Sequence, residues 1–137
     1  MAGALPRLVL NLPPRTLKSF LVSVCLPAWL LGRDPSARII CASYAEDLSN
    51  KFSRDSRALM ESASFKRLCP SARLDKRKIT EGEFETTRRG YRLATSVGGV
   101  LTGRGGDVLV IDDPVKANDG NSQPALLEPM TGFAIRR

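Results

Sequence analysis

The chain has 137 residues, of which 42% are hydrophobic and 26% are charged, and its formal net charge is +7. This composition is typical of a globular protein, and the length suffices for one domain with a real hydrophobic core. The chain contains no histidine, which excludes His-based triads, His-ligated metals and His general bases. Any chemistry must therefore use carboxylates, Lys, Arg, Ser or Thr.

Cysteine use and hydropathy predict a reducing compartment and no membrane partner. Three cysteines without CxxC spacing are present at Cys25, Cys41 and Cys69. Neither a disulfide framework nor a zinc site is indicated. The apolar run at residues 20–31 is too short to span a bilayer, and Pro27 and Trp29 interrupt it, unlike a signal peptide. We therefore expect a cytoplasmic protein.

The first half of the chain predicts a strand, a helix, a strand and a helix. Residues 7–12 are expected to form a short strand that ends at two prolines, which cannot donate to a ladder. A buried helix is expected at 20–31, kinked or shortened by Pro27. Residues 38–43 predict a second buried strand. An amphipathic helix is expected at 44–61. Its predicted core-facing residues are Leu48, Phe52, Leu59 and Met60.

The second half predicts mostly strands. Residues 65–70 are expected to be helical or irregular, and the charged stretch 73–82 is expected to be a loop. A hairpin is expected from strands 83–87 and 91–96. A glycine-rich loop at 98–106 then precedes a further strand. This order predicts an α/β fold with a largely parallel sheet, in a domain of residues 1–121 followed by an irregular tail at 122–137.

In the stretch 107–114, four apolar residues run unbroken into Asp112, Asp113 and Pro114. Its apolar run predicts a strand that is buried on both faces. Its acidic end would lie at the carboxyl edge of the sheet, where open α/β sheets bind ligands. Two adjacent acids there need a cation, and a hydrated Mg²⁺ is the usual one.

The first predicted strand-to-helix turn has features of a phosphate-binding loop. It consists of Pro13, Pro14, Arg15, Thr16, Leu17, Lys18 and Ser19. Lys18 and Ser19 stand where a P-loop has its phosphate-binding Lys and its Mg²⁺-binding Ser or Thr. The GxxxxGK[ST] pattern is absent, however, because Leu17 takes the place of the glycine before the lysine. Taken alone, the turn is explained better by a surface lysine after a buried strand. The acidic pair 94 positions after Lys18 gives the arrangement of P-loop ATPases.

Several segments together resemble the large terminase subunit of tailed bacteriophages and prophages over roughly residues 7–120. They are 7–19 (RLVLNLPPRTLKS), 27–36 (PAWLLGRDPS), 42–44 (ASY), 94–107 (ATSVGGVLTGRGGD) and 111–116 (IDDPVK). Large terminases are Mg²⁺-dependent ATPase motors that translocate viral DNA into a procapsid, and they carry a separate nuclease domain. The resemblance implies a P-loop NTPase-like sheet with flanking helices, here incomplete. The upstream adenine-binding segment, the later coupling motif and the nuclease domain would all be missing.

The resemblance also implies roles for single residues. Residues 13–19 would form a deviant Walker A loop, in which Lys18 contacts the ATP phosphates. Ser19 and Asp112 would hold Mg²⁺. Asp113 would take the place of the catalytic acid, where many relatives carry Glu. Arg104 would be an arginine finger that reaches the nucleotide of a neighbouring subunit.

The implied partners are double-stranded DNA, the small terminase subunit and the portal, with a homo-oligomeric ring in the cytoplasm of a bacterial host cell. Two alternatives stay open. The chain is either a non-catalytic, truncated prophage remnant, or a basic nucleic-acid-binding protein. The latter would use residues 51–92, where twelve basic residues accompany six acidic ones, although a solvated helix face has a similar composition.

Overall fold

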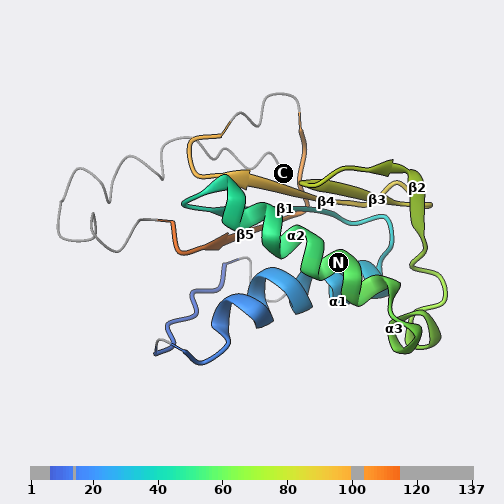
Figure 1. The fold of residues 1–137 in the computed structure, drawn as a ribbon, viewed down its shortest axis with the longest axis horizontal. Helices are drawn as coiled ribbons and strands as arrows, with labels where there is room; N and C mark the ends of the chain where they lie inside the picture. The colour runs from blue at the N-terminus through green and yellow to red at the C-terminus, as the bar shows by residue number, and fades with distance from the viewer. Residues whose placement is uncertain (1–6, 14, 100–103, 115–137) are drawn as a thin grey trace.

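A mixed sheet of five strands is the centre of the computed structural model, which describes residues 7–13, 15–99 and 104–114. The strand order is β2-β3-β4-β1-β5 (Figure 1). Strands β1 (Arg38–Ser43), β4 (Tyr91–Ser96) and β5 (Val108–Asp112) are parallel, whereas β2 (Leu74–Ile79) and β3 (Glu83–Thr86) run antiparallel to their neighbours. The predicted α/β class is therefore confirmed, with a parallel centre and an antiparallel hairpin extension.

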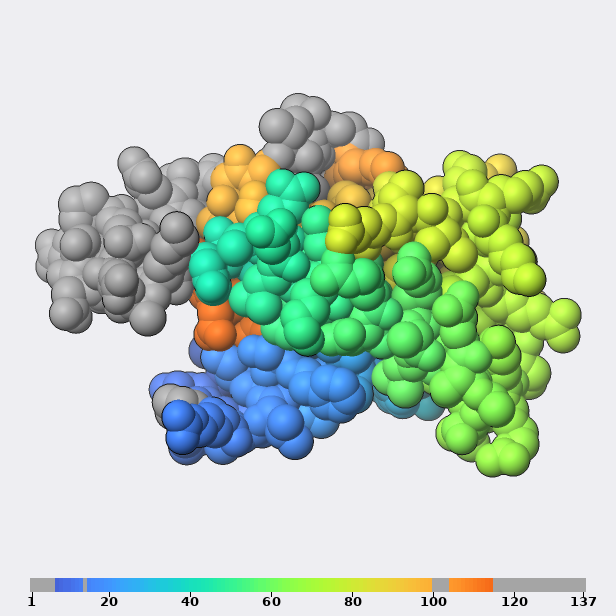
Figure 2. Space-filling view, viewed as in Figure 1, coloured from blue at the N-terminus to red at the C-terminus, as the bar shows by residue number. Residues whose placement is uncertain are grey.

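The described helices pack on one another and on one face of this sheet. They are η1 (Phe20–Cys25, a π-helix), α1 (Leu26–Arg33), α2 (Glu46–Glu61) and α3 (Ala63–Leu68). Figure 2 shows the blue N-terminal helices lying against the green α2. One core lies between helices and sheet, including Leu31, Met60, Ile39 and Phe84. None of the helices in the described ranges is both long and apolar enough to cross a membrane.

The predicted helix at 20–31 forms and continues to Arg33, but its first part is a wide π-helical turn. The Leu26 N–H donates to the carbonyl of Leu21, five residues earlier. Pro27 follows in the first turn of α1, where its fixed φ suits a helix. Because Pro27 has no N–H, it leaves a carbonyl of the preceding turn free for another donor.

One predicted strand and one predicted loop are wrong. The strand predicted at residues 7–12 does not form, because these residues pair with no described partner, and Leu8 and Val9 are 69% and 90% exposed. The charged stretch 73–82 contains β2 instead of a loop. Leu74 and Ile79 pair with β3, while Lys76, Arg77 and Lys78 are exposed. Charged side chains are common on such edge strands because they discourage further pairing.

The strand that ends in the acidic pair is an outer strand of the described sheet, pairing only with β1. It was predicted to be buried on both faces, which is wrong: Val110 and Asp112 are buried, but Ile111 is 41% exposed. An outer strand that packs on helices with one face buries only alternate residues.

The amphipathic α2 has an unexpected buried face. Of the four predicted core-facing residues, Phe52 and Met60 are buried, and Leu48 and Leu59 are partly buried. Three serines are buried on the same helix, namely Ser49, Ser53 and Ser56. Two of their hydroxyls reach backbone carbonyls, from Ser49 to Cys41 and from Ser56 to Val24. A hydroxyl can be buried in this way when a carbonyl oxygen accepts its hydrogen bond.

The core can be tested at Phe84, whose side chain is fully buried. We expect Phe84→Ala to lower the free energy of unfolding by about 3–5 kcal/mol, because it removes buried area and leaves a cavity. Leu68→Ala is the control, since Leu68 is 80% exposed and its loss should change stability by less than about 0.5 kcal/mol. Urea unfolding followed by circular dichroism measures both. Equal effects would contradict the packing described above.

Candidate functional site

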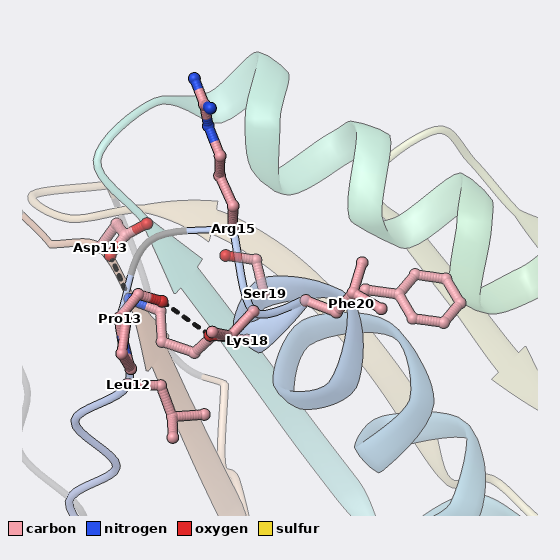
Figure 3. Close-up of a pocket in the computed structure, with 9 residues that line it drawn as sticks. Leu12, Pro13, Arg15, Lys18, Ser19, Phe20 and Asp113 are labelled. Carbon is pink, nitrogen blue, oxygen red and sulfur yellow. Dashed lines mark hydrogen bonds and ion pairs between the residues drawn. The ribbon is translucent and has the colours of Figure 1, made fainter.

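A hollow of about 630 Å³ lies where the N-terminal segment turns into η1 (Figure 3). It is lined by Leu12, Pro13, Arg15, Thr16, Leu17, Lys18, Ser19, Phe20 and Asp113. Six of the seven residues predicted to form a phosphate loop therefore meet one of the two predicted acids. The seventh, Pro14, lies outside the described residues.

The backbone of this loop takes a conformation that side chains rarely adopt. Arg15 and Leu17 have φ angles of +63° and +59°, whereas Thr16 between them has no positive φ. The Thr16 hydroxyl donates to the carbonyl of Pro13 at 2.7 Å and closes the turn. Left-handed residues are a component of anion-binding nests, in which successive N–H groups turn toward one side. Leu17 has the φ of a glycine at the position where P-loops carry one.

The start of η1 adds unpaired donors at the same place. The Leu21 N–H donates to the carbonyl of Leu17 at 2.9 Å, so the preceding N–H groups have no acceptor within the helix. Ser19 at the N-cap makes no capping hydrogen bond with its side chain. A helix start with uncapped N–H groups carries partial positive charge and favours an anion.

Lys18 joins the loop to the acidic pair. Its Nζ lies 2.7 Å from Asp113 Oδ1, in a hydrogen bond, and 3.9 Å from Asp112 Oδ1. The hydrogen bond to Asp113 and the charges of both carboxylates raise the pKa of Lys18 above its ordinary value of 10.5. The ammonium therefore stays charged at every physiological pH. The structure thus brings together Lys18 and the two acids, from opposite ends of the described chain.

The two acids have different environments. Asp112 ends β5 with its side chain 4% exposed, whereas the side chain of Asp113 is 51% exposed. Asp112 Oδ2 accepts a hydrogen bond of 2.9 Å from the hydroxyl of Ser23, in a buried position. Asp113 has a φ of +46°, and its carbonyl accepts from the Tyr44 N–H at 3.1 Å. One acid is thus held inside, while the other faces the hollow.

Ser23 is a site residue that the sequence argument missed. It lies four positions after Ser19, on the same helical segment, and that spacing places both hydroxyls on one helix face. The spacing was the available signal. Ser19 lines the hollow, but Ser23 makes the contact with Asp112.

Arg104 does not join this cluster. Its guanidinium donates to both carboxylate oxygens of Glu83, at 2.7 and 2.8 Å, and lies over the ring of Tyr91. Tyr91 begins β4, and β4 and β5 both run parallel to β1. Arg104 is therefore at the opposite end of the sheet from Asp112. Part of the glycine-rich loop, residues 100–103, lies outside the described residues.

Oxygen atoms of the kind that Mg²⁺ prefers gather at this end of the sheet. Asp113 and Ser19 line the hollow, and the buried Asp112 lies beside them. No group of three His, Cys, Asp or Glu residues that could hold a metal occurs in the described part of the chain. A metal here would therefore need oxygens from water and from the ligand itself, which is how Mg²⁺ usually binds with nucleotides. The Lys18 ammonium already shows that the acidic pair accepts a cation.

Comparison of the chain with protein-family models gave no match, and searches of curated proteins and of solved structures gave none either.

The loop conformation can be tested by replacing Leu17 with glycine. A non-glycine residue in the left-handed region costs about 1–2 kcal/mol. Glycine avoids that cost, but it lowers stability by about 0.5–1 kcal/mol because it loses more conformational entropy on folding. We therefore expect Leu17→Gly to leave the free energy of unfolding unchanged or raise it by up to about 1 kcal/mol.

Leu21→Gly is the matched control, because Leu21 is exposed like Leu17 (52% against 69%) but lies within η1. It should lower stability by about 1 kcal/mol. Chemical unfolding of both variants decides the matter. Equal destabilisation by the two glycines would contradict the left-handed conformation at Leu17.

Proposed function

We propose that this chain is a Mg²⁺-dependent nucleotide-binding module of the P-loop type, from the ATPase part of a terminase-like DNA-packaging motor. The observation that carries the proposal is the position of Lys18. Its ammonium lies within 4 Å of both acids at the end of a parallel strand. It also follows a loop with two left-handed residues, at the start of a helix.

The proposed chemistry assigns one task to each group. Lys18 leaves Asp113 and contacts the terminal phosphates of ATP, while the N–H groups of the loop and helix start bind the remaining oxygens. Ser19 and Asp112 would hold Mg²⁺, and the charge of the metal would neutralise the charge that develops on the phosphate oxygens. Asp113 orients and polarises the attacking water. Its exposure suits this task, although its side chain is one methylene shorter than that of Glu.

The oligomeric part of the proposal concerns Arg104. In the described chain it binds Glu83, far from its own hollow, so it could act as an arginine finger only on a neighbouring subunit. A ring would bring such a neighbour, with double-stranded DNA, the small terminase subunit and the portal as partners. Arg104 would have to exchange Glu83 for the phosphates of that neighbour.

Binding of nucleic acid by residues 51–92 alone has weaker support. Arg92, one of the twelve basic residues counted there, is fully buried. Five of the six acids in this stretch form ion pairs with basic residues, namely Asp55, Asp75, Glu81, Glu83 and Glu85. Burial of Arg92 thus removes one charge from the exposed surplus, and the ion pairs occupy basic groups that would otherwise be free to contact a polyanion.

The phosphate role of Lys18 can be tested by calorimetry with ATP and Mg²⁺. We expect Lys18→Ala to weaken binding at least about tenfold, because a charge-assisted hydrogen bond contributes about 1.5–3 kcal/mol. Lys51→Ala is the control, since Lys51 binds Asp55 on the surface of α2 and its loss should leave affinity unchanged. Equal affinity of wild type and Lys18→Ala would refute the assignment.

Turnover is a separate question from binding. Because Arg104 lies away from the hollow of its own chain, we expect the purified monomer to bind ATP but release phosphate very slowly. Addition of double-stranded DNA should raise the rate only where subunits associate. Phosphate release at increasing protein concentration, with and without DNA, measures this. Fast turnover that is independent of protein concentration would contradict the shared-site mechanism.

A further inference from the structure

Arg92 is a buried cation without an acidic partner in the described structure. Its side chain is fully buried on β4, and no carboxylate of the described residues forms an ion pair with it. Its Nη2 donates to the backbone carbonyl of Ser23 at 3.1 Å, while Nε and Nη1 have no partner among the described residues. Burial lowers the pKa of Arg92 below its ordinary value. Burying an arginine in this way is costly, so its position needs an explanation.

Ser23 connects this arginine to the acidic end of β5. The hydroxyl of Ser23 donates to Asp112 Oδ2 at 2.9 Å, and its carbonyl accepts from Arg92 at 3.1 Å. Ser23 itself is 1% exposed. Its carbonyl is available because Pro27, one turn later, has no N–H to offer the helix. The wide turn of η1 and the proline thus allow Ser23 to contact Asp112 through its hydroxyl and Arg92 through its carbonyl.

The contact of Ser23 fixes the orientation of Asp112. With Oδ2 bound to Ser23, the other oxygen, Oδ1, lies 3.9 Å from Lys18 Nζ on the side of the hollow. A carboxylate held through one oxygen presents the other in a set direction. Such outer contacts orient a ligand group before a metal arrives, and their removal typically weakens metal binding about 10–100-fold.

We propose that Ser23 is a positioning residue for the magnesium site, and that Arg92 holds Ser23 in place through its carbonyl. The inference rests on the proposed nucleotide-binding function and extends it to two residues outside the loop and the acidic pair. Neither residue would touch the nucleotide. Both would increase the extent to which Mg²⁺ raises the affinity for ATP. Neither would change the direct contacts that Lys18 and the loop make with the nucleotide.

The experiment compares Ser23→Ala with Ser56→Ala. The hydroxyl of Ser56 is also fully buried and donates to a carbonyl of the same helical segment, Val24 O, at 3.1 Å. Calorimetry measures ATP affinity for each protein in EDTA and in excess Mg²⁺, and chemical unfolding confirms that each is folded. We expect Ser23→Ala to keep the affinity in EDTA and to reduce the Mg²⁺-dependent gain about tenfold or more. Ser56→Ala should keep both.

Arg92→Met tests the second part of the proposal without leaving a charge inside. Met keeps an unbranched apolar stem and removes a buried charge that is costly without a partner, so this variant should fold. We expect it to reduce the Mg²⁺-dependent gain in affinity at least threefold while the affinity in EDTA stays the same. An unchanged gain in Arg92→Met would overturn the role of Arg92.

The outcomes separate this inference from the proposed function. If the wild type binds no ATP, with or without Mg²⁺, the proposed function fails and the inference fails with it. If the wild type binds with a Mg²⁺-dependent gain that Ser23→Ala retains, only the inference is overturned. If Ser23→Ala and Ser56→Ala lose the gain equally, Ser23 has a packing role alone, and the inference is likewise overturned.

Discussion

The structure depends on the neutralisation of two adjacent carboxylates at the end of one strand. Asp112 is almost fully buried, and a buried carboxylate is stable only with hydrogen bonds and a nearby cation. Ser23 supplies the first and Lys18 the second. Both come from a segment about ninety positions earlier, so the helix start must lie against the carboxyl end of β5. That constraint places the loop, the helix and the acids around one hollow.

The parallel centre of the sheet explains why these groups meet at one edge. Ser43 of β1 lies in register with Asp112 on one side and with Ser96 on the other, so three strands end together. Parallel strands share such an edge because their directions agree. Asp112 takes the helix-covered side of β5, as Val110 does. Asp113, one residue past the strand, has left the ladder and is free to face outward. Asp112 and Asp113 are neighbours in the sequence, yet one is buried and the other is exposed, because the strand ends between them.

Residue patterns predicted the α/β class and the strands 38–43 and 91–96, because apolar runs and turn residues determine these features. Lys18 meets the acids as expected, although the strand 7–12 from which that expectation started does not form. The patterns did not predict β2, whose charges resemble a loop but belong to an exposed edge. They also failed at residues 7–12, which have the composition of a strand but no partner strand among the described residues, since pairing is a property of the whole fold. Buried polar residues such as Ser23 and Arg92 were missed for a related reason. Composition alone does not reveal a hydroxyl or guanidinium that is buried on a carbonyl.

The energetically unfavourable features of the described fold, namely positive φ angles and buried charged groups, are concentrated around the hollow. Three of the four described non-glycine residues with positive φ line it, namely Arg15, Leu17 and Asp113. The fourth, Arg89, lies in the turn of the β3–β4 hairpin, where such a conformation is ordinary. The buried Asp112 and the poorly satisfied Arg92 are connected to the same place through Ser23. A sequence selected for stability alone would spread or remove such costs, whereas binding sites retain them because ligand geometry requires them. This concentration favours a ligand-binding role for the hollow independently of any family resemblance.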